Sequence, residues 1–353
     1  MIQMGAERDR RTVRVGFVGL GWIGRMRMGA LLDGGAAEAV GVCDPCEEAC
    51  AAALGEAAGA RRATSLEELL EMGVDGVAIA TPNALHESQA VAALEAGASV
   101  FCQKPLAPRA AGARRVIDAA RANDRLLAVD WSYRHLRGVR RIVELIRRGE
   151  LGRVVAVDAT FHNAYGPEGA WFYDRLAAGG GCLVDLGVHL LDLAMEVLPG
   201  ERLRVDQSDV FAKGRSLSSD PDSPAEDFVW ATLRSDRGAA VRAACSWRGH
   251  TGADCAIELR VHGSRGAASV RNVAGSFYVF ETRRQTGASE EVIEREEGDW
   301  RGGAIVDWAS RLALDGRFDP VVERAARVSE LVEAIYACAG GATRGGRRRS
   351  CGS

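Results

Sequence analysis

The sequence has little of what several protein classes require. Its formal net charge is −3 over 353 residues, and without a broad basic footprint we expect no nucleic-acid partner. No run of about 18 uncharged apolar residues appears, and residues 1–12 hold no apolar core of signal-peptide length, so we expect no membrane partner and a cytoplasmic protein. The nine cysteines are odd in number, scattered and without zinc-site spacing, which indicates a reduced protein with no metal site.

What the sequence does contain is an alternation of strands and helices in its first third. Short apolar strands are predicted within 13–18, 39–43, 76–80, 99–102 and 126–129, with helical segments between them. Continuous apolar strands separated by helices are typical of a parallel sheet covered on both faces. We therefore predict an α/β fold here, a doubly wound Rossmann domain over residues 1–130.

The pattern changes in the second part of the chain, where strands follow one another without helices. They are predicted at 154–161, 204–211, 227–234, 239–247, 256–263, 267–271 and 276–282. This pattern indicates an open, mainly antiparallel sheet with one free face, and we assign 131–319 to an α+β substrate and oligomerisation domain. We expect the helix at 320–340 to pack back on the N-terminal domain, and the basic tail at 341–353 to be disordered.

A glycine-rich turn follows the first predicted strand. Gly19, Gly21 and Gly24 form a G-x-G-x-x-G that opens a helix inside a βαβ unit, the context in which this motif binds dinucleotides. The glycines permit a tight turn, approach of a diphosphate and close helix–strand packing, while the helix N-terminus offers N–H donors to phosphate. We therefore predict that this turn, including Trp22 and Ile23, binds a nicotinamide cofactor.

The end of the second predicted strand favours NAD over NADP. Asp44 lies 20 residues beyond Gly24, where an acidic side chain would accept hydrogen bonds from the adenosine ribose hydroxyls. A carboxylate at this place repels a 2′-phosphate, and no arginine directly follows it.

Three later segments hold polar residues that catalysis could use. ATPNALHE (80–87) and CQKPL (102–106) each follow a predicted strand, at the sheet edge where ligands bind in this architecture. GGGCLVDLGVHLLD (179–192) leads three glycines into an apolar helix. Taken singly, each segment also has an ordinary structural interpretation, such as a helix cap, a solvated lysine or a core histidine.

Together, in this order and spacing, the motifs resemble the glucose–fructose oxidoreductase / inositol dehydrogenase (Gfo/Idh/MocA) family over nearly the whole chain. The resemblance implies hydride transfer between a nicotinamide cofactor and a carbinol carbon of a sugar or cyclitol. It also implies catalytic roles for Lys104, Asp185 and His189, a cis Lys104–Pro105 bond, and a dimer or tetramer. The residues that it places near the nicotinamide and its ribose are Thr81, Pro82, Asn83, His86, Gln103 and Lys104.

The chain departs from the family at one of these positions. The family usually has Glu before the lysine, whereas this chain has Gln103. Glutamine keeps the shape and the hydrogen-bonding capacity of that side chain but drops its negative charge, so we expect that cofactor binding can survive the change.

The chemistry of a secondary alcohol fits the three implied catalytic residues. Its oxidation needs a base for the hydroxyl proton, and an imidazole such as that of His189 suits this role. Asp185, one helical turn earlier, would share a face with His189 and stabilise the imidazolium. Lys104 would stabilise the developing alkoxide. Asp192, three residues beyond His189, is expected on the helix surface or behind the histidine.

The substrate contacts and the exact reaction are less sharply defined by the sequence. The residues predicted to line the substrate cleft are Tyr133, Arg134, His162, Asn163 and Trp171. The substrate is expected to be a sugar, nucleotide sugar, aminosugar or cyclitol. Two alternatives stay open: a redox-neutral glycosidase- or epimerase-type enzyme that reduces bound NAD transiently, and a non-catalytic dinucleotide-binding subunit. Net NADH formation distinguishes the first, and the intact Lys–Asp–His trio argues against the second.

Overall fold

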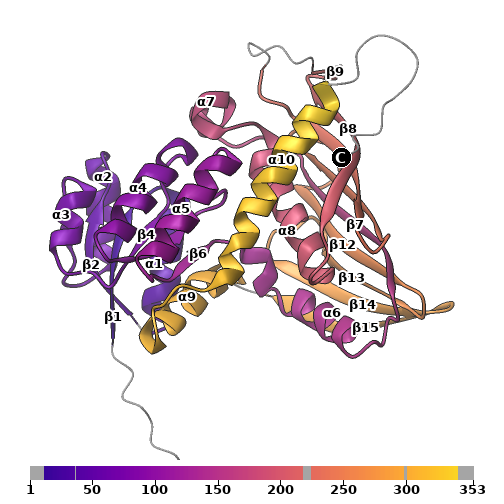
Figure 1. Cartoon of the computed structure of the whole chain (residues 1–353), viewed down its shortest axis with the longest axis horizontal. Helices are drawn as coiled ribbons and strands as arrows, with labels where there is room; N and C mark the ends of the chain where they lie inside the picture. The colour runs from indigo at the N-terminus through magenta and orange to yellow at the C-terminus, as the bar shows by residue number, and fades with distance from the viewer. Residues whose placement is uncertain (1–11, 36, 218–223, 298–299, 341–353) are drawn as a thin grey trace, which may run out of the picture. The chain divides into compact units, whose positions relative to one another are not determined.

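A computed structural model of the chain (Figure 1) describes residues 12–35, 37–217, 224–297 and 300–340. Its contacts divide the chain into two compact units. The first comprises Met1–Leu106, Gly112–Asp130 and Arg301–Glu323, and the second comprises Ala107–Ala111, Trp131–Trp300 and Arg324–Ser353. The predicted disordered tail lies outside the described residues.

The first unit is built on a six-stranded parallel sheet, which confirms the Rossmann prediction. The strands are β1 (Val13–Val18), β2 (Ala37–Cys43), β3 (Arg61–Arg62), β4 (Gly76–Ile79), β5 (Ser99–Cys102) and β6 (Leu127–Val129), in the order β3-β2-β1-β4-β5-β6. The helices are α1 (Trp22–Asp33), α2 (Glu47–Glu56), α3 (Leu66–Glu71), α4 (Asn83–Glu95), α5 (Ala110–Ala122) and α9 (Gly303–Leu314). The strand order reverses between β1 and β4, and ligands bind at such a switch point in open parallel sheets.

Helices cover both faces of this sheet, and one of them comes from far along the chain. Val15 and Phe17 of β1 pack into a core with α1 and α9, in which Trp308 is fully buried. The intervening residue, Gly16, faces α3, because a Cβ there would lie 2.8 Å from the Leu69 side chain. The segment 301–323 therefore groups with the parallel sheet rather than with the rest of the predicted 131–319 domain.

The second unit is built on a nine-stranded sheet in which every pair is antiparallel except β7 with β11. The order is β15-β14-β13-β12-β7-β11-β10-β8-β9. The strands are β7 (Val154–Asn163), β8 (Leu203–Ala212), β9 (Arg215–Ser216), β10 (Phe228–Ser235), β11 (Ala240–Ser246), β12 (Cys255–Gly263), β13 (Ala267–Asn272), β14 (Val279–Thr286) and β15 (Ser289–Glu297).

The edge strand β15 was missing from the sequence prediction. It reads SEEVIEREE and has no apolar alternation that would mark a strand. Cross-strand ion pairs with β14 hold it instead: Arg283 contacts Glu290, and Arg295 contacts Glu281 at 2.7 Å. Charged residues on an edge strand also discourage pairing with another chain.

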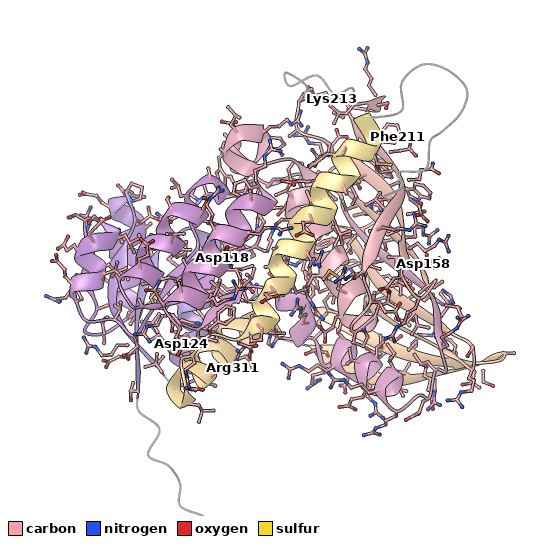
Figure 2. All side chains as sticks on the ribbon, viewed as in Figure 1. Asp118, Asp124, Asp158, Phe211, Lys213 and Arg311 are labelled. Carbon is pink, nitrogen blue, oxygen red and sulfur yellow. The ribbon has the colours of Figure 1, made fainter. Side chains whose placement is uncertain are left out.

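Within the part of the chain that the structure describes, helices cover one face of this sheet and leave the other open. The helices of the unit are α6 (Arg137–Arg147), α7 (Arg175–Ala178), α8 (Val188–Val197) and α10 (Arg324–Gly340). Among these, α8 contacts β7, and α10 runs along β8 and beside α8 (Figure 1). The open face carries polar residues such as Asp158, which pairs with Arg242 at 2.9 Å and with His262 at 3.3 Å (Figure 2 labels Asp158).

The segment at 320–340 divides between the two units. Its first turn, Pro320–Glu323, belongs to the first unit and contacts β6, while α10 belongs to the second unit. The predicted packing of the whole segment on the N-terminal domain stays a prediction.

One segment of the described residues resembles a membrane span by length and composition. It is Arg175–Val197, and 78% of its most apolar window is buried inside the structure. It includes Asp185 and Asp192, so it differs from the uncharged apolar run that the sequence was expected to lack. Core helices with this degree of burial satisfy the same criterion.

Candidate functional site

The glycine-rich turn between β1 and α1 is tightly packed at two of its three glycines. Gly19 has φ of +85°, and a Cβ there would lie 2.5 Å from the Ala80 carbonyl carbon. A Cβ on Gly24 would lie 2.0 Å from the Gly19 carbonyl oxygen. Both glycines are therefore required by the fold itself, one for the turn and one for helix–strand contact.

Gly21 differs, because nothing in the described structure requires a glycine there. Its φ is −61°, and a Cβ on it would meet no atom within 4 Å. It is the N-cap of α1, and no side chain caps this helix. Open space in front of uncapped N–H groups fits a bound diphosphate. The adjoining Trp22 is 65% exposed and Ile23 is half-buried.

Asp44 connects the second strand to this turn. Its Oδ2 accepts a hydrogen bond from the Leu20 backbone N–H at 2.6 Å, and its Oδ1 accepts one from the Cys46 N–H at 2.8 Å. Each carboxylate oxygen has a second lone pair, so both oxygens can still accept a ribose hydroxyl. The structure thus places Asp44 beside the glycine turn, as the dinucleotide motif requires.

The loop after β4 is joined to the loop after β5 by His86. The imidazole is fully buried; its Nε2 lies 2.8 Å from the Thr81 carbonyl oxygen and its Nδ1 lies 2.7 Å from the Pro105 carbonyl oxygen. Burial lowers the pKa of His86, although both carbonyls favour the charged ring. Because neither ring nitrogen is left to contact a cofactor, the direct contact predicted for His86 is corrected to an indirect role of holding the two loops together.

Other residues of these two loops occupy different positions. Pro82 is the exposed N-cap of α4, and Asn83 is its buried first residue. The Thr81 hydroxyl donates to the Gln89 side-chain oxygen at 2.7 Å. Lys104 is half-buried and precedes a cis peptide bond with Pro105, as the family resemblance implied.

Gln103 has a physical reason to be an amide. Its Nε2 donates to the carboxylate of Asp130, which is fully buried and also receives the Arg27 Nε at 2.5 Å. A glutamate at 103 would bring a second carboxylate against Asp130, which is costly in a buried site. The amide oxygen of Gln103 is still able to accept a hydrogen bond. A small pocket beside the glycine turn is lined by Phe17, Gly19, Gly24, Arg27, Ala78, Ile79, Ala80, Phe101 and Gln103.

In the second unit, each of the three consecutive glycines before Asp185 has its own cause. Gly179 has φ of +85°. A Cβ on Gly180 would lie 2.2 Å from the Tyr336 hydroxyl, and one on Gly181 would lie 2.1 Å from the Glu226 carbonyl oxygen. The chain passes too close to its neighbours here to carry side chains.

The buried carboxylate of Glu226 fixes the end of this glycine segment. Its Oε1 accepts hydrogen bonds from the Gly181 N–H at 2.8 Å, the Leu183 N–H at 3.0 Å and the Tyr336 hydroxyl at 2.7 Å. Burial raises the pKa of Glu226 above its usual value, and the three hydrogen-bond donors only partly oppose this shift. Neither Glu226 nor Tyr336 was predicted from the sequence, since both lie far from the glycines along the chain.

Asp185 lies in a π-helical turn, Leu183–Gly187, and not in the α-helix that the sequence predicted. Such turns are rare and occur often at functional sites. The Asp185 Oδ2 accepts a hydrogen bond from the Trp247 indole N–H at 3.0 Å. Trp247 was also missed, although it directly follows β11, whose carboxyl end lies beside that of the parallel strand β7.

His189 is enclosed by aromatic rings. It is 7% exposed, and its ring centroid lies 4.9 Å from that of Tyr133, 6.2 Å from that of Trp131 and 6.5 Å from that of Phe161. Tyr133 was predicted as a substrate contact, and the structure brings it against the proposed base. Trp131 and Phe161 were not predicted.

The Arg134 guanidinium is paired with carboxylates of the protein itself. Its predicted role as a substrate ligand is therefore corrected. Its guanidinium forms a two-pronged ion pair with Asp192 and lies 3.8 Å from Glu196. Asp192 is nearly fully buried on α8, one turn beyond His189, so it does not lie on the helix surface, and the ion pair ties Arg134 to this helix.

His162 and Asn163 cannot both face α8, because successive residues of a strand point to opposite faces. Phe161 faces His189, so His162 faces the open side, where its Nδ1 lies 2.8 Å from the Ser246 Oγ and its ring stacks on Phe228. The predicted role of His162 in the substrate cleft is therefore corrected. Burial lowers the pKa of His162.

Asn163 ends β7 on the same side as Phe161. Its Oδ1 is a buried acceptor that has no hydrogen-bond partner among the described residues, which is uncommon for a buried polar atom. Trp171 lies in the 3-10 turn Ala170–Tyr173, half-buried and stacked on Phe172 with ring centroids 3.8 Å apart. The substrate contacts expected for Asn163 and Trp171 stay predictions.

Comparison with known proteins agrees with this geometry in both units. Residues 13–131 match the oxidoreductase family model with an NAD-binding Rossmann fold, and residues 139–269 match the GFO/IDH/MocA C-terminal domain. A protein of Amycolatopsis mediterranei (strain S699), named as a UDP-kanosamine synthase oxidoreductase subunit, is 32% identical over 94% of this chain and 97% of its own length.

Solved structures show the same fold over most of the chain. GenD2 from gentamicin A biosynthesis, in complex with NAD, has a TM-score of 0.78 at 26% identity and covers 100% of both chains. KijD10, a 3-ketoreductase from Actinomadura kijaniata in complex with NADP and TDP-benzene, has a TM-score of 0.79 at 20% identity over 93% of this chain and 98% of its own. The chain therefore belongs to the Gfo/Idh/MocA oxidoreductase family and is a nicotinamide-dependent dehydrogenase or reductase acting on CH–OH groups.

Proposed function

We propose that this protein transfers hydride between NAD and a secondary alcohol or ketone of a sugar, nucleotide sugar, aminosugar or cyclitol. The observation that carries the proposal is the local fixing of an acid and a histidine on one buried helical segment. Asp185 is held by Trp247, and His189 is held by an aromatic cage. A helix interior that exists only to pack has no need of either side chain.

In this proposal the chain's own residues move the proton and orient the substrate. When bound, the oxidised nicotinamide supplies the hydride acceptor. His189 takes the hydroxyl proton, Asp185 stabilises the imidazolium that forms, and Lys104 stabilises the developing alkoxide. A substrate hydroxyl would donate to the unpartnered Asn163 Oδ1. In the direction of reduction the same groups act in reverse.

We propose NAD as the preferred cofactor because of the acidic end of β2. Asp44 accepts the Leu20 and Cys46 N–H groups, and Glu47 and Glu48 occupy the first turn of α2 directly after it. A 2′-phosphate brought to this place would meet several carboxylates. The catalytic efficiency measured with NADH should exceed that measured with NADPH; the opposite order would refute this preference.

The free face of the nine-stranded sheet supports self-association into a dimer or tetramer. It carries the partly exposed Phe228 beside Phe211, together with the Asp158 ion pairs. Apolar area rimmed by charges is typical of interaction surfaces. Light scattering during size-exclusion chromatography should give a mass at least twice that of one chain, and a monomer would refute the proposal.

The proposed reaction is tested by NADH formation with a panel of cyclitols, aminosugars and nucleotide sugars. His189→Ala should lower kcat by about 10²–10⁴-fold while NADH fluorescence titration shows unchanged cofactor binding. His262→Ala, on the open face, is the matched control and should keep its turnover. Turnover by His189→Ala at the wild-type rate would overturn the assignment. Sugar conversion without net NADH would indicate the redox-neutral alternative.

A further inference from the structure

Side chains at the carboxyl ends of β7 and β11 form a group with Tyr173 of the 3-10 turn Ala170–Tyr173. We call Asn163, Tyr173, Trp247 and Arg248 the Arg248 cluster; all four lie in the second unit. The Trp247 indole donates to Asp185, and its ring lies 5.4 Å from that of Tyr173 between centroids. The Arg248 guanidinium carbon lies 5.6 Å from the Tyr173 ring centroid. The cluster therefore forms a continuous series of contacts from the catalytic carboxylate to an arginine.

Arg248 is unusual in its backbone and in its surroundings. It has φ of +57°, a conformation that costs free energy for a residue with a side chain and that concentrates at binding sites. The side chain is exposed, and among the described residues it has a ring contact but no acidic partner. Arg134, by contrast, is paired with Asp192. Asp174, next to Tyr173, is committed to capping α7.

The backbone after Arg248 is tied to the end of β7. The Gly249 N–H donates to the Asn163 carbonyl oxygen at 2.7 Å, which holds Arg248 beside Asn163, whose Oδ1 is a buried acceptor without a partner. Among the described residues, the Asn163 Oδ1 lacks a hydrogen-bond donor, and the Arg248 guanidinium lacks an acidic partner. A sugar hydroxyl could donate to Asn163, and a phosphate could pair with Arg248.

We propose that the substrate is a phosphate ester of a sugar, with its phosphate on Arg248. This inference rests on the proposed function and narrows its substrate class. The sugar would lie at Asp185 and Asn163, and the phosphate would contact the guanidinium, whose planar N–H donors match phosphate oxygens. The phosphate can belong to a simple glycosyl phosphate or to a nucleoside diphosphate sugar.

The proposal is tested by calorimetric titration of the full-length protein in the presence of NADH. The probes are UDP-glucose, α-D-glucose 1-phosphate and uncharged methyl α-D-glucoside. Arg248→Gln should weaken binding of the two phosphorylated probes by about tenfold to a hundredfold and leave the uncharged glucoside unchanged. Arg248→Lys, which keeps the charge, should give an intermediate loss. Arg237→Gln, an exposed turn arginine that loses the same charge, is the matched control and should change none of the three affinities.

The outcomes distinguish a nucleotide sugar from a simple sugar phosphate, and they test phosphate binding separately from NADH binding. Tighter binding of UDP-glucose than of glucose 1-phosphate supports a nucleotide sugar, and equal binding supports a simple phosphate ester. The proposal is overturned if neither phosphorylated probe binds more tightly than the glucoside, or if Arg248→Gln binds them as the wild type does. NADH binding, read in the same samples by fluorescence, reports separately on the proposed oxidoreductase function, which fails if no NADH binds.

Discussion

The residue that most directly prepares the proposed acid for chemistry is Trp247. Its indole N–H donates a hydrogen bond to the Asp185 carboxylate, and its ring packs against Tyr173 and Phe172. A fixed donor holds the carboxylate in one orientation, which is the usual way in which a second layer of residues supports a catalytic group.

Trp247→Phe should remove this donor and keep the ring packing. We expect kcat to fall about tenfold to a hundredfold, because a hydrogen bond to a charged group is lost, and KM for NAD to stay unchanged. Steady-state kinetics of NADH formation measure both values. Trp230→Phe, on the open-face side of β10, is the matched control and should leave kcat unchanged. An equal loss in both variants would contradict a specific role for the indole N–H.

His86 gives a prediction about pH. Burial lowers the pKa of His86 in the folded protein. Below about pH 6.5 the imidazole is therefore protonated in the unfolded chain but stays neutral in the folded one. The stability that neutral His86 contributes is therefore complete above about pH 6.5 and is lost as the pH falls below it. Between about pH 7.5 and 5.5, the free energy of unfolding measured in urea should fall less for His86→Gln than for the wild type. An equal fall in both proteins would contradict this role of His86.

At the residue scale, the sequence singled out residue types for the proposed site, but it could not give the directions of their side chains. Asp185 and His189 could be chosen because polar residues in an apolar helix demand an explanation. His162 and Asn163 were predicted together although strand alternation separates them, and Arg134 was chosen without its buried partner Asp192. Partners distant in sequence, such as Glu226 for the glycines, leave no local signal.

At the scale of elements, the β1–α1 turn separates two reasons for a glycine. Gly24 is required by the Gly19 carbonyl, whereas Gly21 has open space around it. We expect Gly24→Ala to lower the free energy of unfolding by about 3 kcal/mol. We expect Gly21→Ala to change it by less than about 1 kcal/mol but to weaken NADH binding.

These variants are measured by urea unfolding and by NADH fluorescence titration. Gly29→Ala is the matched control, because Gly29 lies in the same helix and a Cβ there also meets no atom within 4 Å. It should change neither the stability nor the affinity. Wild-type affinity in Gly21→Ala would show that no diphosphate approaches this backbone.

The elements themselves followed from the sequence where a regular apolar pattern existed. The parallel strands and the helices between them have such a pattern, and the structure confirms the Rossmann fold. The strand β15 has charges in place of a pattern, and the π-helical turn at Asp185 arises from tertiary contacts of the glycine segment with Glu226 and Tyr336. Neither cause is visible in a local window of sequence.

At the scale of the whole molecule, the chain passes between the two units several times. The sequence pattern placed one boundary near residue 130, where the strand spacing changes, and another near residue 320, where a returning helix was expected to begin. The earlier return at residue 301 could not be seen, since the apolar stripe of α9 does not say which sheet it covers. Its Ile305, Trp308 and Ala309 are all fully buried in the parallel-sheet core.

Trp308→Ala tests whether α9 belongs energetically to the cofactor-binding unit. Its ring packs on Phe101 with centroids 5.8 Å apart and approaches Gly76, so truncation should lower the stability of the first unit by about 3–5 kcal/mol. NADH stabilises only the unit that binds it, so in calorimetry the loss should fall on the transition that NADH raises. Leu314→Ala, at an exposed position of the same helix, should leave both transitions in place. A loss confined to the transition that NADH does not affect would show instead that α9 unfolds with the nine-stranded sheet.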